Sequence, residues 1–269
     1  MQKQNTCPSA RDVLVSLSIA HEGNWNKIHA DIKIHEPFDM TIQKSTDDCI
    51  TIVDADYPKE LLQTSQPPFV LYVKGNADLL RASPDAILSV VGVRNPTDYA
   101  AKYSAEMGVA CANRGLILCA KVSRGCARKA LRACAEAGGR CIAVMSSGFD
   151  KPYPDDEENA KTIDAVLASG GVIVSEYPIG TLPKPESFVA SSRIVTALGK
   201  ALFVPQADVQ SGAMIAVAFA LNAGKDVAAI PFEATEGSKI QNNFLIANGA
   251  ALVYDADGFL EEEYHGIRI

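Results

Sequence analysis

The sequence has few histidines and no closely spaced cysteines. Its four histidines are at positions 21, 29, 35 and 265, so none lies between residues 36 and 264. Of seven cysteines, the five from Cys111 to Cys141 recur at alternating intervals of eight and seven residues, without a C-x-x-C pair. Structural metal sites and disulfide frameworks need tighter cysteine and histidine spacing. We therefore expect no metal site, and we interpret these cysteines as small buried side chains.

Long hydrophobic runs are also lacking. The most apolar stretches, such as Ala213–Leu221 and Val227–Ile230, are much shorter than a membrane span. The N-terminal residues MQKQNTCPSARD are polar and carry no apolar signal core. We therefore predict a cytoplasmic protein that does not associate with membranes.

Positive charge is in deficit, because the chain has a formal net charge of −7. A globally acidic protein is poorly suited to coat nucleic acid non-specifically, since phosphate contacts need clustered lysine and arginine. Any binding of nucleic acid must therefore depend on a local group of cations.

The common catalytic and cofactor motifs are missing as well. The sequence contains no G-x-S-x-G, no G-x-G-x-x-G and no G-x-x-x-x-G-K-[ST]. A phosphoribohydrolase would need a PGGxGT-type loop with a catalytic glutamate, which Ala168–Gly171 does not supply. We predict no catalytic residue and no cofactor, and we interpret the chain as a binding protein rather than an enzyme.

From Ile87 onward, short apolar runs alternate with amphipathic segments of helix length. The expected strands are Ile87–Val91, Leu116–Ala120, Cys141–Met145, Val172–Ser175, Ala201–Val204 and Asp226–Ile230. The expected helices are Asp98–Asn113, Arg124–Ala137, Asp156–Ser169, Ser192–Leu198 and Gly212–Ala223. This alternation predicts an α/β fold, a doubly wound and mostly parallel Rossmann-like sheet with helices on both faces.

The first residues have a different pattern. Ser9–His21 could form a helix capped by Ser9, and the segment after it, through Trp25 to Pro37, is aperiodic. We predict a small N-terminal helical element over residues 1–48 and the Rossmann-like domain over residues 49–269. In such a sheet, ligands bind at the carboxyl ends of the strands.

The first of these strand ends is the best candidate for an anion site. Gly92, Arg94, Asn95 and Thr97 follow the strand and precede a helix. A glycine there lets a phosphate approach backbone amides, the helix start adds a favourable dipole, and Arg94 can clamp a phosphate. The alternative is an ordinary strand–turn–helix junction with a surface arginine.

The second strand end carries a run of cations. Lys121, Ser123, Arg124, Gly125 and Arg128 follow it, with further cations at Lys129 and Arg132. Arginines at intervals of four share one helix face. This run of cations is equally consistent with a site for an anionic partner and with a helix face exposed to solvent.

Later strand ends add further candidates. Gly148 follows the third strand and Ser175-Glu176 the fourth, where Glu176 could accept a hydrogen bond from a nucleotide or pair with an arginine. The helix after the fifth strand opens at Ser211-Gly212-Ala213, a second possible anion site or an ordinary helix cap.

A series of short strings, each weak alone, is specific in its order. They include Asp56-Tyr57-Pro58, Lys74-Gly75-Asn76, Val91–Thr97, Gly148-Phe149-Asp150, Tyr153-Pro154, Ser175–Pro178, Phe188 with Arg193-Ile194-Val195, Ser211-Gly212-Ala213, Gly237-Ser238 and Gly249-Ala250. In this order they resemble the DprA/Smf family of DNA-processing proteins, over about Cys49 to Tyr254.

The resemblance implies an extended Rossmann-like fold that binds single-stranded DNA, forms a homodimer and helps to load the RecA recombinase during natural transformation. Gly92, Arg94 and Thr97 would then line a phosphate pocket, with Ser211–Ala213 near it. Arg193 matches the last arginine of the family's F-P-x-R-N-R, although Ser191-Ser192 replaces its Arg-Asn.

Other departures from the family's sequence lie at the strand ends that are predicted to form the binding crevice. The family's S-G-x-A-x-G-I-D-x-x-A-H reads Ala120–Leu131 here, without its serine–glycine turn, aspartate or histidine, and Gln206 stands where the family has an acidic residue. Lys121 and Arg128 can restore positive charge nearby. We therefore expect a divergent member with altered binding of single-stranded DNA, which falls steeply with salt. The alternative is a paralogue that binds a nucleotide or a nucleotide-derived ligand in the same crevice.

Overall fold

The computed structural model describes residues 8–34, 42–234 and 239–264. The family string Gly237-Ser238 lies outside the described residues. So do residues 1–7 and 35–41 of the predicted N-terminal element and residues 265–269 of the predicted Rossmann-like domain. The described strands form one sheet in the order β1-β2-β6-β5-β4-β3-β7-β8-β9. They are β1 (Asp48–Thr51), β2 (Val70–Gly75), β3 (Ile87–Val90), β4 (Ile117–Lys121), β5 (Cys141–Met145), β6 (Val172–Ser175), β7 (Ala201–Val204), β8 (Asp226–Ala229) and β9 (Ala251–Leu252).

The sheet is parallel from β6 to β9, and β1 and β2 extend it in the antiparallel sense. β3 lies in its centre between β4 and β7, so the chain runs outward to one side through β4, β5 and β6 and then returns to the other side at β7. This reversal is the switch point at which such sheets bind ligands. The predicted doubly wound, mostly parallel α/β sheet is confirmed.

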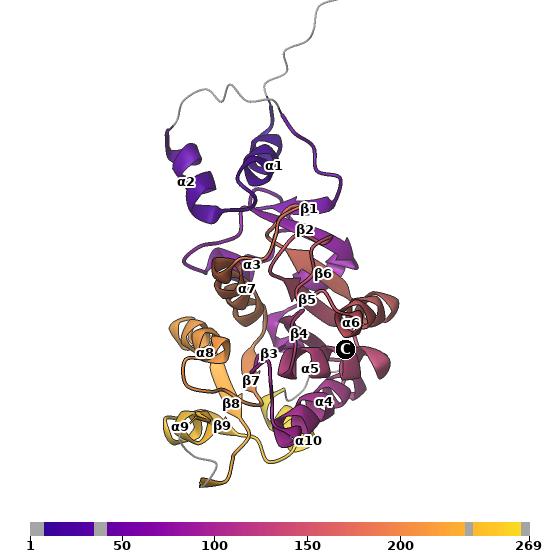
Figure 1. The fold of residues 1–269 in the computed structure, drawn as a ribbon, viewed down its shortest axis with the longest axis vertical. Helices are drawn as coiled ribbons and strands as arrows, with labels where there is room; N and C mark the ends of the chain where they lie inside the picture. The colour runs from indigo at the N-terminus through magenta and orange to yellow at the C-terminus, as the bar shows by residue number, and fades with distance from the viewer. Residues whose placement is uncertain (1–7, 35–41, 235–238, 265–269) are drawn as a thin grey trace, which may run out of the picture.

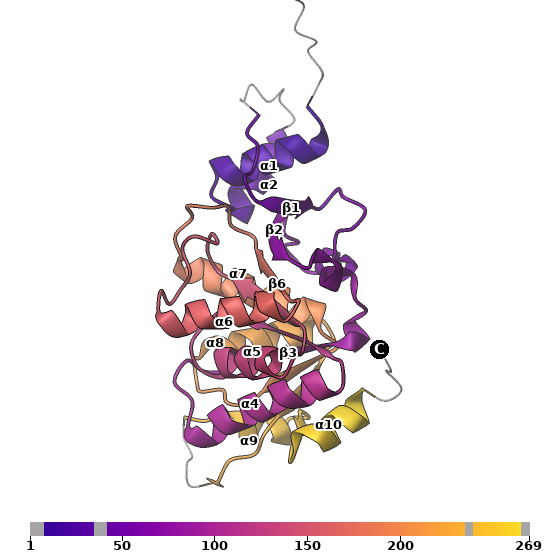
Figure 2. The same ribbon diagram turned by 90° about the vertical axis from the view of Figure 1, so that its right-hand side faces the viewer.

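Helices cover both faces of the sheet (Figure 1). They are α3 (Lys59–Leu62), α4 (Asp98–Asn113), α5 (Cys126–Glu136), α6 (Glu157–Ala168), α7 (Pro185–Leu198), α8 (Gly212–Asn222), α9 (Asn242–Ala247) and α10 (Ala256–Glu263). In Figure 2, α4, α5 and α6 lie side by side in front of the sheet, while α7 and α8 lie behind it. Short 3₁₀ turns at Ala77–Arg81 and Pro84–Ala86 lead into β3.

Alternate residues of the central strands supply the two cores. Leu88 and Val90 pack under α4 and α5, whereas Ile87 and Val91 face α7 and α8. Strands buried on both faces need continuous apolar sequence, which explains the uninterrupted runs that predicted them. Four of the regularly spaced cysteines belong to the first core and Cys119 to the second. Burial raises the pKa of the Cys111 and Cys119 thiols, and it raises that of Cys126 to about 11.

The N-terminal segment contributes α1 (Ala10–Ala20) and α2 (Trp25–Ile34), which lie over the β1–β2 end of the sheet (Figure 1). Ser9 caps α1 as expected, because its side chain accepts the N–H of Asp12. Leu14 and Val15 pack against Tyr72 of β2. Within the part of the chain that the structure describes, no helix is both long and apolar enough to cross a membrane.

Candidate nucleic-acid interface

A cavity of about 600 Å³ opens at the carboxyl ends of β3, β4 and β7, beside the first turns of α7. Its size falls within the range of about 300–1,000 Å³ usual for ligand sites. Eight residues predicted from the strand ends line it: Gly92, Arg94, Asn95, Lys121, Ser123, Ser211, Gly212 and Ala213. Val91, Val93, Pro185, Phe188, Val189, Ser192, Asp208 and Ile215 complete the lining.

Hydrogen bonds that Gln206 accepts hold the loop after β3. Its backbone oxygen accepts the N–H of Val93 at 3.0 Å, and its Oε1 accepts the N–H of Thr97 at 2.9 Å. Thr97 in turn caps α4 by accepting the N–H of Ala100. Thr97 therefore fixes the helix start beside the cavity and is not part of its lining. The side-chain amide of Gln206 also donates to Asp208 at 3.0 Å. An acidic residue in place of Gln206 would have no N–H group to donate to Asp208.

Two glycines allow the loops after β3 and β4 to touch. A Cβ on Gly92 would lie 2.5 Å from the Cβ of Cys126, so its absence lets α5 pack against the loop. Gly125 has φ +81°, and a Cβ there would lie 2.2 Å from the carbonyl oxygen of Val93. The N–H of Cys126 donates to that same oxygen. Gly92 and Gly125 therefore position the backbone that carries Arg94.

Arg94 lies over two aromatic rings at the mouth of the cavity. Its guanidinium carbon is 4.8 Å from the ring centre of Phe188 and 5.7 Å from that of Tyr153. The two rings meet at an angle of 61° with centres 5.2 Å apart. Arg94 is exposed and forms no ion pair with any described carboxylate. A stacked guanidinium keeps its N–H edge free for a phosphate.

Lys121 projects from the end of β4 into the same cavity. Its Nζ donates to Ser192 Oγ at 3.0 Å and to the carbonyl oxygen of Phe188 at 3.4 Å. Burial, with the charge of Arg94 as a second cause, lowers the pKa of Lys121 to about 8. No described carboxylate lies within ion-pair distance of it.

The start of α8 forms the opposite wall. Ser211 does not cap this helix, because its Oγ accepts the N–H of Asp208 at 3.2 Å instead. The amides of Gly212 and Ala213 thus have no side-chain acceptor among the described residues, and a Cβ on Gly212 would meet open space. Helix N-termini attract anions through free N–H groups and the helix dipole. Asp208 is the one carboxylate among the lining residues.

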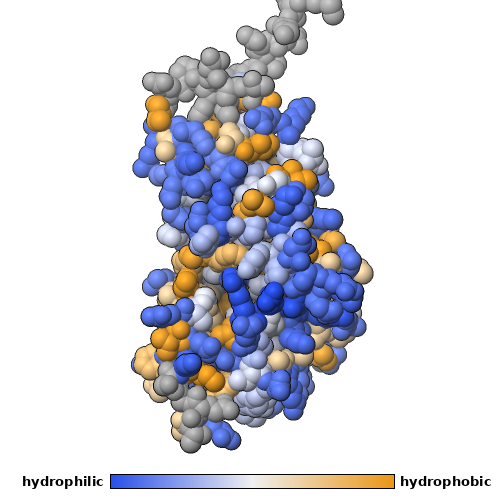
Figure 3. All heavy atoms as spheres, in the orientation of Figure 1, coloured by the Kyte–Doolittle hydropathy of each residue, from blue (hydrophilic) through white to orange (hydrophobic). Residues whose placement is uncertain are grey.

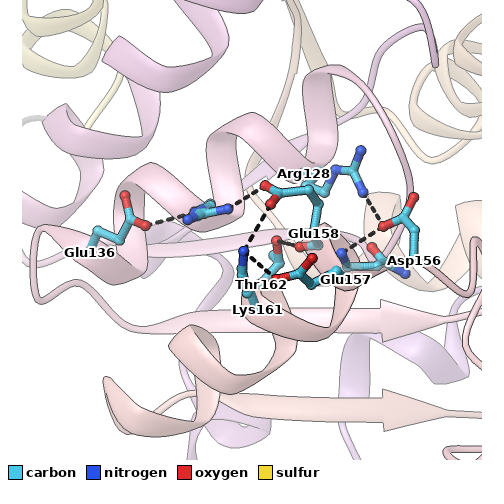
Figure 4. A network of polar contacts seen from close by, with 9 residues as sticks. Arg128, Glu136, Asp156, Glu157, Glu158, Lys161 and Thr162 are labelled. Atoms are coloured by element: carbon cyan, nitrogen blue, oxygen red, sulfur yellow. Dashed lines mark hydrogen bonds and ion pairs between the residues drawn. The ribbon is translucent and has the colours of Figure 1, made fainter.

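The arginines after β4 lie outside this cavity and face α6 instead. Arg128 pairs with Asp156 at 2.7 Å, and Arg124 lies 3.9 Å from the same carboxylate. Arg132 contacts Glu136 and Glu158. Figure 4 shows Asp156, Glu157 and Glu158 at the start of α6 with Lys161, and Glu136 at the end of α5. Arg124 also precedes α5 rather than forming part of it, since the helix begins at Cys126.

Glu176 and Arg193 form a buried ion pair away from the cavity lining. Arg193 Nη1 and Nη2 donate to the two carboxylate oxygens of Glu176 at 2.9 and 2.6 Å, and both side chains are at most 5% exposed. Arg193 also donates to the carbonyl oxygens of Gln66 and Ala190. The pair ties α7 to the end of β6 and to the loop before β2.

The remaining candidates are likewise placed elsewhere. Ser175 is fully buried and donates to the carbonyl oxygen of Ser147 at 2.7 Å. Gly148 packs against the loop after β6, where its N–H donates to Thr181. Conversely, Phe188 and Tyr153 are part of the candidate interface, but they were not among the predicted site residues. In the sequence they stand out only as part of the strings shared with the family. No sequence spacing links two aromatics that α7 and the loop before α6 bring together.

The sequence and the fold are both similar to those of known proteins. Residues 48–263 match the family model described as DNA recombination-mediator protein A. The chain is 32% identical over 222 residues to Protein Smf from Synechocystis sp., covering 81% of this chain and 54% of that protein. It is 31% identical over 212 residues to DNA processing protein DprA from Streptococcus pneumoniae, covering 79% and 73%. The chain spans about half the length of several curated relatives that it matches.

Two solved structures are similar over most of the fold. The X-ray structure of DprA from Streptococcus pneumoniae has a TM-score of 0.72 at 27% identity, covering 88% of this chain and 80% of that one. DprA from Helicobacter pylori, described for its single-stranded DNA binding mode, has a TM-score of 0.70 at 26% identity, covering 82% and 97%. This chain therefore belongs to the DprA/Smf family of DNA-processing proteins.

Proposed function

We propose that this chain binds single-stranded DNA in the cavity at the ends of β3, β4 and β7, and that it acts in DNA processing during transformation or recombination. The observation that carries the proposal is the group of Arg94, Phe188 and Tyr153. A cation over an exposed tyrosine ring and a half-buried phenylalanine ring offers a phosphate contact and a surface for base stacking at one point. A phosphate alone would not need the rings.

The remaining walls suit a strand that passes through. Lys121 supplies a second positive group, and the amides at the start of α8 can donate to a further phosphate oxygen. We expect binding to depend mainly on stacking and charge, because Arg94, Phe188, Lys121 and the amides of α8 are its main contacts. Such binding tolerates different sequences.

The ion pairs along α5 limit the electrostatic part of binding. With Arg128 and Arg132 engaged by carboxylates, Arg94 and Lys121 are the cations available in the cavity. Each phosphate contact on a single strand contributes about −0.7 to the slope of log K against log salt. Two contacts give a slope of about −1.4, shallower than a row of arginines would give.

The test compares labelled oligo-dT with a panel of mononucleotides at several salt concentrations. Arg94→Ala should weaken binding of the oligonucleotide and reduce the salt slope to about −0.7. Arg81→Ala is the matched control, because it removes one exposed arginine that pairs with Asp78 far from the cavity. If a mononucleotide binds as tightly as the oligonucleotide, with no change of affinity with length, the cavity serves a nucleotide ligand instead.

We further propose that the chain forms a homodimer and passes the bound strand to a RecA-type recombinase without catalysing a reaction on it. Leu221 and Phe244 are exposed beside a groove of about 340 Å³ between α8 and α9. Hydrophobic side chains are visible on this side of the molecule in Figure 3. Phe244→Asp should produce a monomer in sedimentation, whereas Val53→Asp on the distant β1 turn should not.

A further inference from the structure

We propose that Lys121 captures abasic sites in single-stranded DNA by forming an imine with the aldehyde of the base-free deoxyribose. This proposal rests on the proposed binding of single-stranded DNA in the same cavity. It assigns to Lys121 a role as a nucleophile, in addition to that of a positive group.

The hydrogen bonds of Lys121 can be made in full by a neutral amine. A neutral amine has two N–H donors and one lone pair, whereas an ammonium has three donors. The two acceptors that Nζ contacts, Ser192 Oγ and the carbonyl oxygen of Phe188, use both donors of the neutral form. The hydroxyl of Ser192 itself donates to Phe188, so its oxygen presents a lone pair to Nζ. The lone pair of Nζ is then left without a protein partner among the described residues, in a side chain that lines the cavity.

Burial and the nearby charge of Arg94 favour the neutral form of Lys121. Arg94 faces it from the β3–α4 loop, α7 contributes only a hydroxyl and a carbonyl oxygen, and Asp208 across the cavity is engaged by Gln206. A pKa of about 8 leaves roughly one amine in ten uncharged at pH 7, against fewer than about one in a thousand for an ordinary lysine. A phosphate bound to Arg94 would offset that charge but not the burial, which is the larger cause.

The amine lies close to the group of Arg94 and Phe188 that is proposed to hold a nucleotide. Nζ contacts the backbone of Phe188, whose ring lies under Arg94. A phosphate on Arg94 would bring the sugar joined to it toward this backbone. The aldehyde of an abasic site is the electrophile that a DNA strand can bring to this place.

The chemistry needs no oxidant or cofactor. The lone pair of Nζ attacks the aldehyde carbon C1′, and the electrons of the C=O bond move to oxygen. Both amine protons then leave with that oxygen as water, so that a C=N bond joins Lys121 to the opened sugar. The reaction is reversible, and no bond of the DNA backbone is broken.

The test traps this imine with sodium borohydride, using a labelled single-stranded oligonucleotide that contains one abasic site. Each protein is used at a concentration that saturates the oligonucleotide, as measured separately by fluorescence anisotropy. We expect a covalent band on a denaturing gel with the wild-type chain, with a yield that rises as the pH passes through about 8. A tetrahydrofuran analogue, which has no aldehyde, should give no band.

Lys121→Arg and Lys121→Met should both lose the band, because neither side chain can form an imine. Lys225→Arg is the matched control, since burial also lowers the pKa of Lys225, which lies outside this cavity. A band that persists in Lys121→Arg, or a wild-type chain that binds the oligonucleotide without a band, overturns the proposal and leaves the proposed function intact. Failure to bind any oligonucleotide overturns both.

Discussion

Glu176→Gln tests whether the buried pair of Glu176 and Arg193 belongs to the framework of the fold. The substitution keeps the size of the side chain and removes its charge. Arg193 is 4% exposed, so its guanidinium would remain buried with only neutral acceptors. Removing one partner of such a pair typically costs about 3–5 kcal/mol, because the other charge stays desolvated. The total stability of a domain is only about 5–15 kcal/mol.

The free energy of unfolding can be measured by urea denaturation followed by circular dichroism. We expect Glu176→Gln to lose about 3–5 kcal/mol. Glu106→Gln, which breaks an exposed contact to Lys102 on α4, should lose less than about 0.5 kcal/mol. Replacing both residues of the buried pair, with Glu176→Gln and Arg193→Met together, should recover part of the loss because no charge is left buried.

A loss in Glu176→Gln no larger than that of Glu106→Gln would refute this reasoning. It would mean that Arg193 reaches solvent and is available to a ligand, as the family string had implied. A framework role instead requires that folded Glu176→Gln binds oligo-dT as the wild type does at low temperature.

Three further predictions concern the loops and charges around the cavity. Gly125→Ala should lose at least about 2 kcal/mol of stability and weaken oligonucleotide binding. Gly138→Ala, which is also at positive φ but has open space around it, should lose only about 1 kcal/mol. Equal losses of the two variants in urea denaturation would contradict the close contact at Gly125. Because the pKa of Lys121 is lowered in the folded chain from 10.5 to about 8, the unfolded chain holds more protons between these values. Stability relative to Lys121→Met should therefore rise with pH across this window, by on the order of 1–2 kcal/mol for a half-buried group, and a fall would contradict the lowered value. Arg128→Ala should leave the salt slope of oligonucleotide binding unchanged, because Asp156 already pairs with this arginine; a slope shallower by about 0.7 would show that Arg128 contacts phosphate.

Much of the fold could be predicted from local pattern. The bounds of β5, β6, β7 and α4 agree with the expected segments, because continuous apolar runs or clear amphipathic stretches end at glycine or at a capping residue. α7 is longer than expected and begins at Pro185, a favourable first position that its serine-rich sequence obscured. α2 was not expected, since Ile28 is its one buried residue and polar residues make up half of its ten positions.

The candidate site was predictable only in part. The ends of adjacent parallel strands meet at one edge, so the strand pattern alone is enough to place Arg94, Lys121 and Ser211 together. Their surroundings depend on tertiary packing. Arg128 is paired because α6 packs beside α5, and Asp156 stands at the start of α6, which the arginine spacing alone does not show.

The most direct test of the proposed interface is a double-mutant cycle between Phe188 and the bases of the ligand. Affinities of the wild type and Phe188→Leu are measured for oligo-dT and for an oligonucleotide of the same length with tetrahydrofuran units in place of the bases. If bases stack on this ring, the two changes should couple by about 1–3 kcal/mol, because each removes the same contact. Effects that add to within about 0.5 kcal/mol would contradict stacking at Phe188, and with it the proposed path of the strand.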